Sequence, residues 1–140
     1  MRKNKGFTLI ELLAVIVILA IIAVITVPKV AEMIETSRQG AAEDAFYGAI
    51  KSAELGWAKA LQKNPALSGD TTCTVGADKT FSCDNGVTMT ISGSAPESGS
   101  LVIDGNGAAA VAADSTTPLV YNGFQCTGTS SKATCTKVTK

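Results

Sequence analysis

Residues 7–27 read FTLIELLAVIVILAIIAVITV, a run of 21 residues in which almost every side chain is apolar. As an α-helix this run would be about 31 Å long, close to the roughly 30 Å hydrocarbon core of a bilayer. Three positive residues precede it, Arg2, Lys3 and Lys5. Because positive residues stay on the cytoplasmic side, we expect the N-terminus inside and the rest of the chain outside.

A basic start followed by an apolar run is also typical of a secretory signal peptide, which is removed at a small-residue site after the run. Here Pro28 and Lys29 separate the run from Ala31, and no Ala-x-Ala site is evident. The apolar run instead continues into a helical pattern. An anchor that stays on the chain is therefore the preferred interpretation.

Glu11 is the only charged residue inside the apolar run. A carboxylate in hydrocarbon costs a few kcal/mol on insertion scales. One explanation is a generic single-pass anchor in which Glu11 reaches up to the headgroups. The other is that Glu11 needs a cation. Because no Lys or Arg occurs between Lys5 and Lys29, that cation would be a terminal amine or a group on another chain.

The residues around Glu11 form the motif Lys5-Gly6-Phe7-Thr8-Leu9-Ile10-Glu11-Leu12-Leu13. A basic residue, a glycine, an aromatic residue and a lone acid, followed by an aliphatic run, resemble the processing site of type IV pilins and type II secretion pseudopilins. The resemblance implies that a prepilin peptidase cleaves after Gly6 and N-methylates Phe7. It also implies that Glu11 neutralises the Phe7 amine of a neighbouring subunit during assembly. The six-residue leader resembles that of the type IVa class.

Pro28 also matches the family, in which the segment before this proline unwinds when subunits pack into filaments. Proline removes one helical hydrogen bond and clashes with the preceding turn, so a helix break is expected at Pro28. Ala20, where the family often has glycine, works against unwinding because alanine is the best helix former.

From Lys29 to Lys63, apolar and small residues recur at three- and four-residue steps, which predicts an amphipathic helix. Asn64-Pro65 ends the pattern, because the residue before a proline disfavours the α conformation. One helix from Phe7 to Lys63 would be about 85 Å long. The expected face comprises Val30, Met33, Ser37, Ala41, Ala45, Ala49, Ala53, Trp57 and Ala60, joined by Ile34, Phe46, Ile50 and Leu61.

Gly40, Gly48 and Gly56 recur every eight residues in this segment. Each weakens a helix by roughly 1 kcal/mol relative to alanine. They can form a thin face for the backbone of a neighbouring chain, or they can simply be small residues packed on a sheet. Ordinary helix-to-sheet packing is the preferred interpretation.

Beyond residue 65 the chain is rich in Gly, Ser and Thr, and short segments alternate between apolar and polar residues. The clearest alternations, 87–91 and 101–103, are expected to face the helix, whereas 127–131 has the composition of a loop. The fold class is α+β: a long N-terminal helix whose amphipathic half packs on an antiparallel sheet of about four strands. Strand candidates are 73–75, 80–83, 87–92, 100–104, 108–112, 118–121 and 133–138.

This polar half contains all four cysteines, Cys73, Cys83, Cys126 and Cys135. An even count in an exported chain predicts disulfides formed in an oxidising compartment, and zinc is the alternative. The spacings lack the close Cys-x2-Cys pairs of structural zinc sites. Turns centred near residue 78 and between residues 130 and 131 would place the cysteines of each pair opposite one another. The local pairs Cys73–Cys83 and Cys126–Cys135 are therefore predicted over the two other connectivities, and Cys126–Cys135 resembles the C-terminal disulfide of pilins.

Several function classes are disfavoured. There is no histidine, the commonest general base, and no Ser or Cys has an identifiable base, so neither an enzyme nor a cofactor is expected. From Phe7 onward, 9 basic residues (12 minus 3) face 12 acidic ones, a balance of −3 that does not indicate a nucleic-acid surface. Asp104, Asn106 and Asp114 suggest calcium only weakly, since their spacing does not fit a calcium loop and Asp-Gly and Asn-Gly are usually turns. No metal is expected.

The resemblance predicts a structural subunit of a type IV pilus. The precursor would sit in the cytoplasmic membrane and then join an extracellular helical filament of identical subunits, built by the pilus assembly machinery. A pseudopilin of a type II secretion or DNA-uptake system is one alternative. A membrane-anchored binding module is another, against which the Glu11 motif argues. The expected parts are a cleaved leader (1–6), a transmembrane and filament-core helix (7–28), an amphipathic helix (29–65) and a disulfide-bonded head (66–140).

Overall fold

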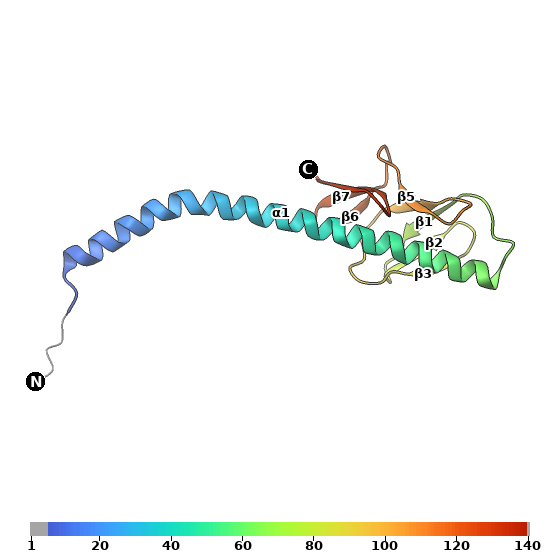
Figure 1. The fold of residues 1–140 in the computed structure, drawn as a ribbon, viewed down its shortest axis with the longest axis horizontal. Helices are drawn as coiled ribbons and strands as arrows, with labels where there is room; N and C mark the ends of the chain where they lie inside the picture. The colour runs from blue at the N-terminus through green and yellow to red at the C-terminus, as the bar shows by residue number, and fades with distance from the viewer. Residues whose placement is uncertain (1–5, 140) are drawn as a thin grey trace, which may run out of the picture. The chain divides into compact units, whose positions relative to one another are not determined.

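The computed structural model describes residues 6–139, which form one long helix and eight strands (Figure 1). Residues 1–5, most of the predicted leader, lie outside the described residues, as does residue 140. The chain divides into two units, 1–37 and 38–140, and α1 contributes to both. The elements are α1 (Leu9–Lys63), β1 (Thr71–Val75), β2 (Thr80–Cys83), β3 (Thr88–Thr90), β4 (Ser100–Ile103), β5 (Ala109–Val111), β6 (Leu119–Tyr121), β7 (Phe124–Thr129) and β8 (Ala133–Lys137).

The ends of α1 lie close to the predicted ones. The helix begins at Leu9, two residues after Phe7, and ends at Lys63 before Asn64-Pro65. The expected break at Pro28 is absent from the isolated chain, because α1 continues through this residue. Proline removes one helical hydrogen bond and crowds the preceding turn, but the other turns of this 55-residue helix keep their bonds, so one proline does not end it. Unwinding at Pro28 within a filament stays a prediction.

In the first unit, α1 presents an almost wholly apolar surface. Every large apolar side chain from Leu9 to Ile34 is at least 49% exposed. Soluble monomers rarely expose a continuous apolar surface of this extent, so such a surface marks contact with a membrane or with other protein.

The second unit is a single antiparallel sheet packed on α1, with strand order β3-β2-β1-β4-β5-β7-β6 and with β8 added beside β7. Figure 1 shows these strands gathered along the teal and green part of α1. The α+β arrangement is as predicted, but the expectation of about four strands is wrong, since the described residues form eight. The sheet is larger because β7, which covers part of the predicted loop 127–131, pairs with β5, β6 and β8 and so joins the C-terminal strands to the rest.

Both hairpins have the predicted register, and both local disulfides form. Cys73 on β1 lies opposite Cys83 on β2. Cys126 on β7 lies opposite Cys135 on β8. All four cysteines are at least 95% buried, so both disulfides lie in the core and not at the surface.

The core lies between one face of α1 and the inner face of the sheet. Burial along the predicted amphipathic segment starts only at Ala42, and it ends at Trp57. The sheet contributes the alternating residues that were expected to face the helix, among them Met89, Ile91 and Leu101. The buried residues of α1 are Ala42, Phe46, Ala49, Ile50, Ala53 and Trp57.

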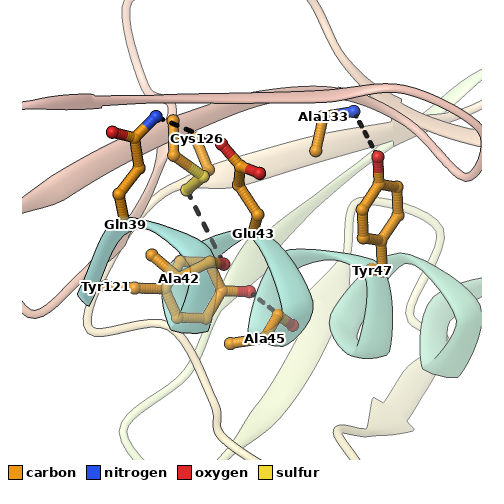
Figure 2. Close-up of a disulfide and its surroundings, with 9 residues drawn as sticks. Gln39, Ala42, Glu43, Ala45, Tyr47, Tyr121, Cys126 and Ala133 are labelled. Carbon is orange, nitrogen blue, oxygen red and sulfur yellow. Dashed lines mark hydrogen bonds between the residues drawn. A yellow bond between two sulfur atoms is a disulfide. The ribbon is translucent and has the colours of Figure 1, made fainter. Parts of the chain in front are cut away.

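Two tyrosines fix the helix to the C-terminal strands (Figure 2). The Tyr47 hydroxyl accepts a hydrogen bond of 2.8 Å from the backbone N–H of Ala133, at the start of β8. The Tyr121 hydroxyl donates to the carbonyl of Ala45 at 3.4 Å, and burial raises the pKa of Tyr121. The Cys126 sulfur lies 3.8 Å from the Ala42 carbonyl oxygen, which is a packing contact because a disulfide sulfur carries no proton.

The three glycines of α1 have different surroundings, which the sequence repeat does not reveal. A Cβ on Gly56 would lie 2.8 Å from Cβ and Cγ of Met89, and one on Gly48 would lie 3.8 Å from the Ser92 carbonyl oxygen. A Cβ on Gly40 would meet nothing within 4 Å. Gly56 and Gly48 thus serve ordinary helix-to-sheet packing, the preferred interpretation of the repeat.

Gly56→Ala is expected to destabilise the head by about 1–3 kcal/mol, because the new methyl group overpacks against the root of the Met89 side chain. Gly40→Ala is the matched control. It gains helix propensity without a clash and is expected to stabilise the chain by up to about 1 kcal/mol. Urea unfolding of the full chain in detergent, followed by Trp57 fluorescence, measures both. Equal stabilisation by the two alanines would contradict the close contact at Gly56.

Candidate assembly site

The predicted cleavage site lies just before α1. Gly6, Phe7 and Thr8 are exposed and not helical. The Phe7 side chain is 93% exposed. The Gly6–Phe7 peptide bond is therefore outside the hydrogen-bonded helix, in a segment that an active site can bind without first unwinding α1.

Thr8 and Glu11 form a capping box that begins the helix. The Glu11 carboxylate accepts hydrogen bonds from the Thr8 backbone N–H at 2.8 Å and from the Thr8 hydroxyl at 2.9 Å. The Glu11 backbone N–H donates to the Thr8 hydroxyl at 3.3 Å, and the Leu12 N–H donates to the Thr8 carbonyl at 3.2 Å. These reciprocal bonds satisfy N–H groups that a helix start otherwise leaves unpaired.

The capping box gives Glu11 a role that the initial sequence reasoning missed. The signal was present, because a Thr followed three residues later by Glu before an apolar run is the sequence pattern of a capping box. Both hydrogen bonds from Thr8 go to the same carboxylate oxygen, Oε2. Neither ion pair of the described residues involves Glu11, so the chain itself, from residue 6 to residue 139, supplies no cation for this carboxylate.

Residues 6–139 contain one helix that is long and apolar enough to cross a membrane, and this helix is α1. By length and composition alone, a signal sequence or a buried core helix meets the same criterion. Burial argues against a core helix in the first unit, where the large apolar side chains of α1 are exposed, whereas the second unit buries its share of α1 under the sheet.

The weak calcium candidate is a structured turn. Asp104 Oδ1 accepts hydrogen bonds of 2.9 Å from the backbone N–H groups of Asn106 and Ala108. The bond from Ala108 is the main reason why the pKa of Asp104 is lowered. The turn carries Gly107, where φ is +88° and a Cβ would lie 3.1 Å from Cδ1 of Trp57. Asp104 thus shapes a turn that covers the core tryptophan, and the described residues hold no cluster of three His, Cys, Asp or Glu suited to a metal.

The remaining predicted site residues do not gather at one place. Pro28 lies inside α1, and the four cysteines lie in the sheet as two separate disulfides. The N-terminal group Gly6, Phe7 and Glu11 is the one set that sequence proximity and the capping geometry place together. It has a carboxylate held at a helix start and an exposed, non-helical peptide bond four residues before it.

In a comparison with known protein families, residues 1–27 match the prokaryotic N-terminal methylation motif. No curated protein and no solved structure matches the chain. The matched region contains Gly6, Phe7, Glu11 and most of the exposed apolar part of α1. Its family is of a structural kind and not a family of enzymes. The chain therefore carries the N-terminal methylation motif, which is the signature of type IV pilins and pseudopilins, and its long helix and antiparallel sheet form a pilin-like α+β arrangement.

Proposed function

We propose that this chain is a structural subunit of a type IV pilus. A prepilin peptidase cleaves it after Gly6 and methylates Phe7. The hydrophobic segment 7–28 holds it in the cytoplasmic membrane before assembly and forms the filament core afterwards. The pilus assembly machinery then adds it to an extracellular helical filament of identical subunits, in which segment 29–65 carries the head, residues 66–140.

The observation that carries this proposal is the position of Glu11. Its carboxylate lies at the start of an exposed apolar helix, four residues after a non-helical peptide bond, and it has no cation within the described residues. Cleavage after Gly6 creates a positive amine at Phe7. In a filament core built from such helices, the amine of one subunit can meet the Glu11 carboxylate of a neighbour. Two opposite charges brought together in a low-dielectric bundle each remove the burial cost of the other. Assembly thus supplies the cation that the Glu11 carboxylate lacks in the single chain.

The proposal is tested by the N-terminus of the mature protein. Mass spectrometry of purified filaments is expected to show a chain that begins with N-methylated Phe7. Gly6→Leu is expected to leave uncleaved precursor in the membrane. A Cβ on Gly6 would meet nothing within 4 Å, so any defect arises at the peptidase and not from misfolding of the chain. A mature chain that begins after Val27 would instead establish an ordinary signal peptide.

The closest alternative is a pseudopilin, which shares the methylation motif but forms only a short filament. The disulfide Cys126–Cys135 favours the pilus, because it closes a C-terminal hairpin and so resembles the C-terminal disulfide of pilins. Electron microscopy of cells with and without this chain distinguishes the two. Long surface fibres that depend on the chain support the pilus, and their absence at native expression supports the pseudopilin.

A further inference from the structure

A groove of about 590 Å³ lies on the head between the C-terminal part of α1 and the edge of the sheet. One wall is α1, with Leu55, Lys59 and Lys63. The other wall is β3 with the turn that precedes it. Figure 1 shows β3 beside the green part of α1. All of the residues that line the groove belong to the second unit.

β3 presents an unpaired strand edge to this groove. It is the terminal strand of the sheet and pairs only with β2. The Ile91 N–H donates to the Lys79 carbonyl across that pair. Hydrogen-bonded and non-hydrogen-bonded positions alternate in an antiparallel ladder, so the backbone groups of Thr88 and Thr90 point away from β2. They are free to bond a further strand.

The next position along this edge already bonds a group from outside the sheet. The Ser92 N–H donates to the Ser52 hydroxyl of α1 at 3.0 Å, and that hydroxyl donates in turn to the Gly48 carbonyl at 2.7 Å. The helix therefore closes one end of the edge. Beyond Ser52, α1 supplies the groove with side chains but no further hydrogen bond to β3 is recorded among the described residues.

The helix wall is apolar at one end and cationic at the other. Leu55 is 60% exposed, and among residues 38–139 the other exposed large apolar side chain is Val102, at 44%. Lys59 and Lys63 follow at four-residue steps and take part in neither salt bridge of the described chain. The described residues that line the groove include no carboxylate, so the charge of these two lysines is uncompensated there.

We propose that this groove binds an extended peptide segment of a partner protein, an acidic segment that adds to β3 as an extra strand. The backbone of the segment bonds Thr88 and Thr90, an apolar side chain packs on Leu55, and carboxylates meet Lys59 and Lys63. Residues four apart on a helix are about 6 Å apart along its axis, and same-face residues of a strand repeat at about 6.6 Å. An apolar residue followed by acids at every second position therefore suits this wall.

Charge disfavours a second copy of this chain as the strand donor. At the far side of the sheet, β8 pairs with β7 and follows Lys132. Placing β8 in the groove would bring Lys132 toward Lys59 and Lys63, and like charges oppose such pairing. The segment therefore comes from a different polypeptide.

The test uses the full chain, isotope-labelled in detergent micelles, and the capped synthetic peptide Thr-Val-Thr-Glu-Thr-Glu-Thr together with its reversed sequence. At least one of the two is expected to shift the amide resonances of Thr88 and Thr90. Replacing both glutamates of the peptide by lysine is expected to weaken binding about tenfold, and so is the protein variant Lys59→Glu/Lys63→Glu. Lys132→Glu, with the same kind of charge change at an exposed turn, is expected to leave binding unchanged.

Three results would overturn the proposal. One is equal binding of the acidic and the basic peptide. Another is a shift confined to β8 and not to β3. The third is no shift in Thr88 or Thr90 with millimolar peptide; if Leu55→Ser then also dissociates a dimer of the protein itself, a second copy is the occupant. Because Leu55, Lys59 and Lys63 are exposed, their variants retain the core, and an unchanged Trp57 indole resonance verifies this.

Discussion

Glu11→Gln is expected to abolish filament formation while insertion, cleavage and folding of the head stay unchanged. Glutamine keeps the acceptor that the capping box with Thr8 requires, because Glu and Gln both serve at that position. It removes the charge that the Phe7 amine of a neighbour needs. That amine would then be buried unpaired, at a cost of about 3–5 kcal/mol. At about 1.4 kcal/mol per tenfold change, each subunit addition becomes at least about a hundredfold less favourable.

The measurement compares surface filaments with the membrane pool when the variant is the sole pilin at native level. Thr8→Val is the matched control, since it removes the hydroxyl of the capping box and keeps the carboxylate of Glu11. Losing a cap costs typically about 1 kcal/mol, so this variant is expected to assemble with a much smaller loss. Normal filaments from Glu11→Gln, together with a severe defect in Thr8→Val, would falsify the charge pairing and leave Glu11 a helix cap.

The same pair of residues shows how far the sequence alone predicts the site. A lone acid in an apolar run is visible without a structure, and so is the need for a cation from outside the run. The start of α1 at Leu9 depends on local hydrogen bonds at Thr8 that hydrophobicity does not report. A pattern search for capping boxes finds this start, whereas a search for apolar periodicity places it two residues early.

In the head, alternation predicts strands well where side chains alternate and fails where glycine replaces them. β7 was missed because Gly128 and its Ser/Thr-rich neighbours have the composition of a loop. Gly128 has φ of +133°, and a Cβ there would lie 2.0 Å from the Lys132 carbonyl oxygen. The glycine is thus needed for the close approach of β7 and β8 at the hairpin. Because glycine has no side chain, Gly128 adds nothing to the alternation of apolar and polar residues by which strands are predicted.

The groove beside β3 could not be predicted from sequence. The sequence identifies Thr88 and Thr90 only as strand residues. Their free backbone groups follow from the strand order, which places β3 at the edge of the sheet. Leu55 likewise fits a helical period, and only the position of the sheet leaves it exposed while Trp57, two residues away, is buried. Which side chains remain open is a property of the tertiary arrangement and not of local pattern.

Removing both disulfides is expected to unfold the head at 37 °C. The two disulfides close loops with sequence separations of 10 and 9 residues. On the chain-entropy account, each disulfide raises the free energy of the unfolded chain by about 2.6 kcal/mol. The two bonds lie on β1–β2 and β7–β8, with β4 and β5 between them. At about 4.8 Å per strand they are roughly 14 Å apart, far enough for their effects to add. The sum, about 5 kcal/mol, equals the whole stability of a marginal small domain.

The variants that measure this carry Cys→Ala at both members of a pair, because the positions are buried and serine would place an unpaired hydroxyl in the core. Removing Cys73–Cys83 alone or Cys126–Cys135 alone is expected to leave a folded head, less stable by about 2–4 kcal/mol. In the wild-type chain, alkylation without reduction should label no cysteine, since the described chain has none free. A fourfold Cys→Ala chain whose free energy of unfolding in urea titration stays within about 1 kcal/mol of wild type would mean that the helix-to-sheet core around Phe46 and Trp57 holds the head without covalent help.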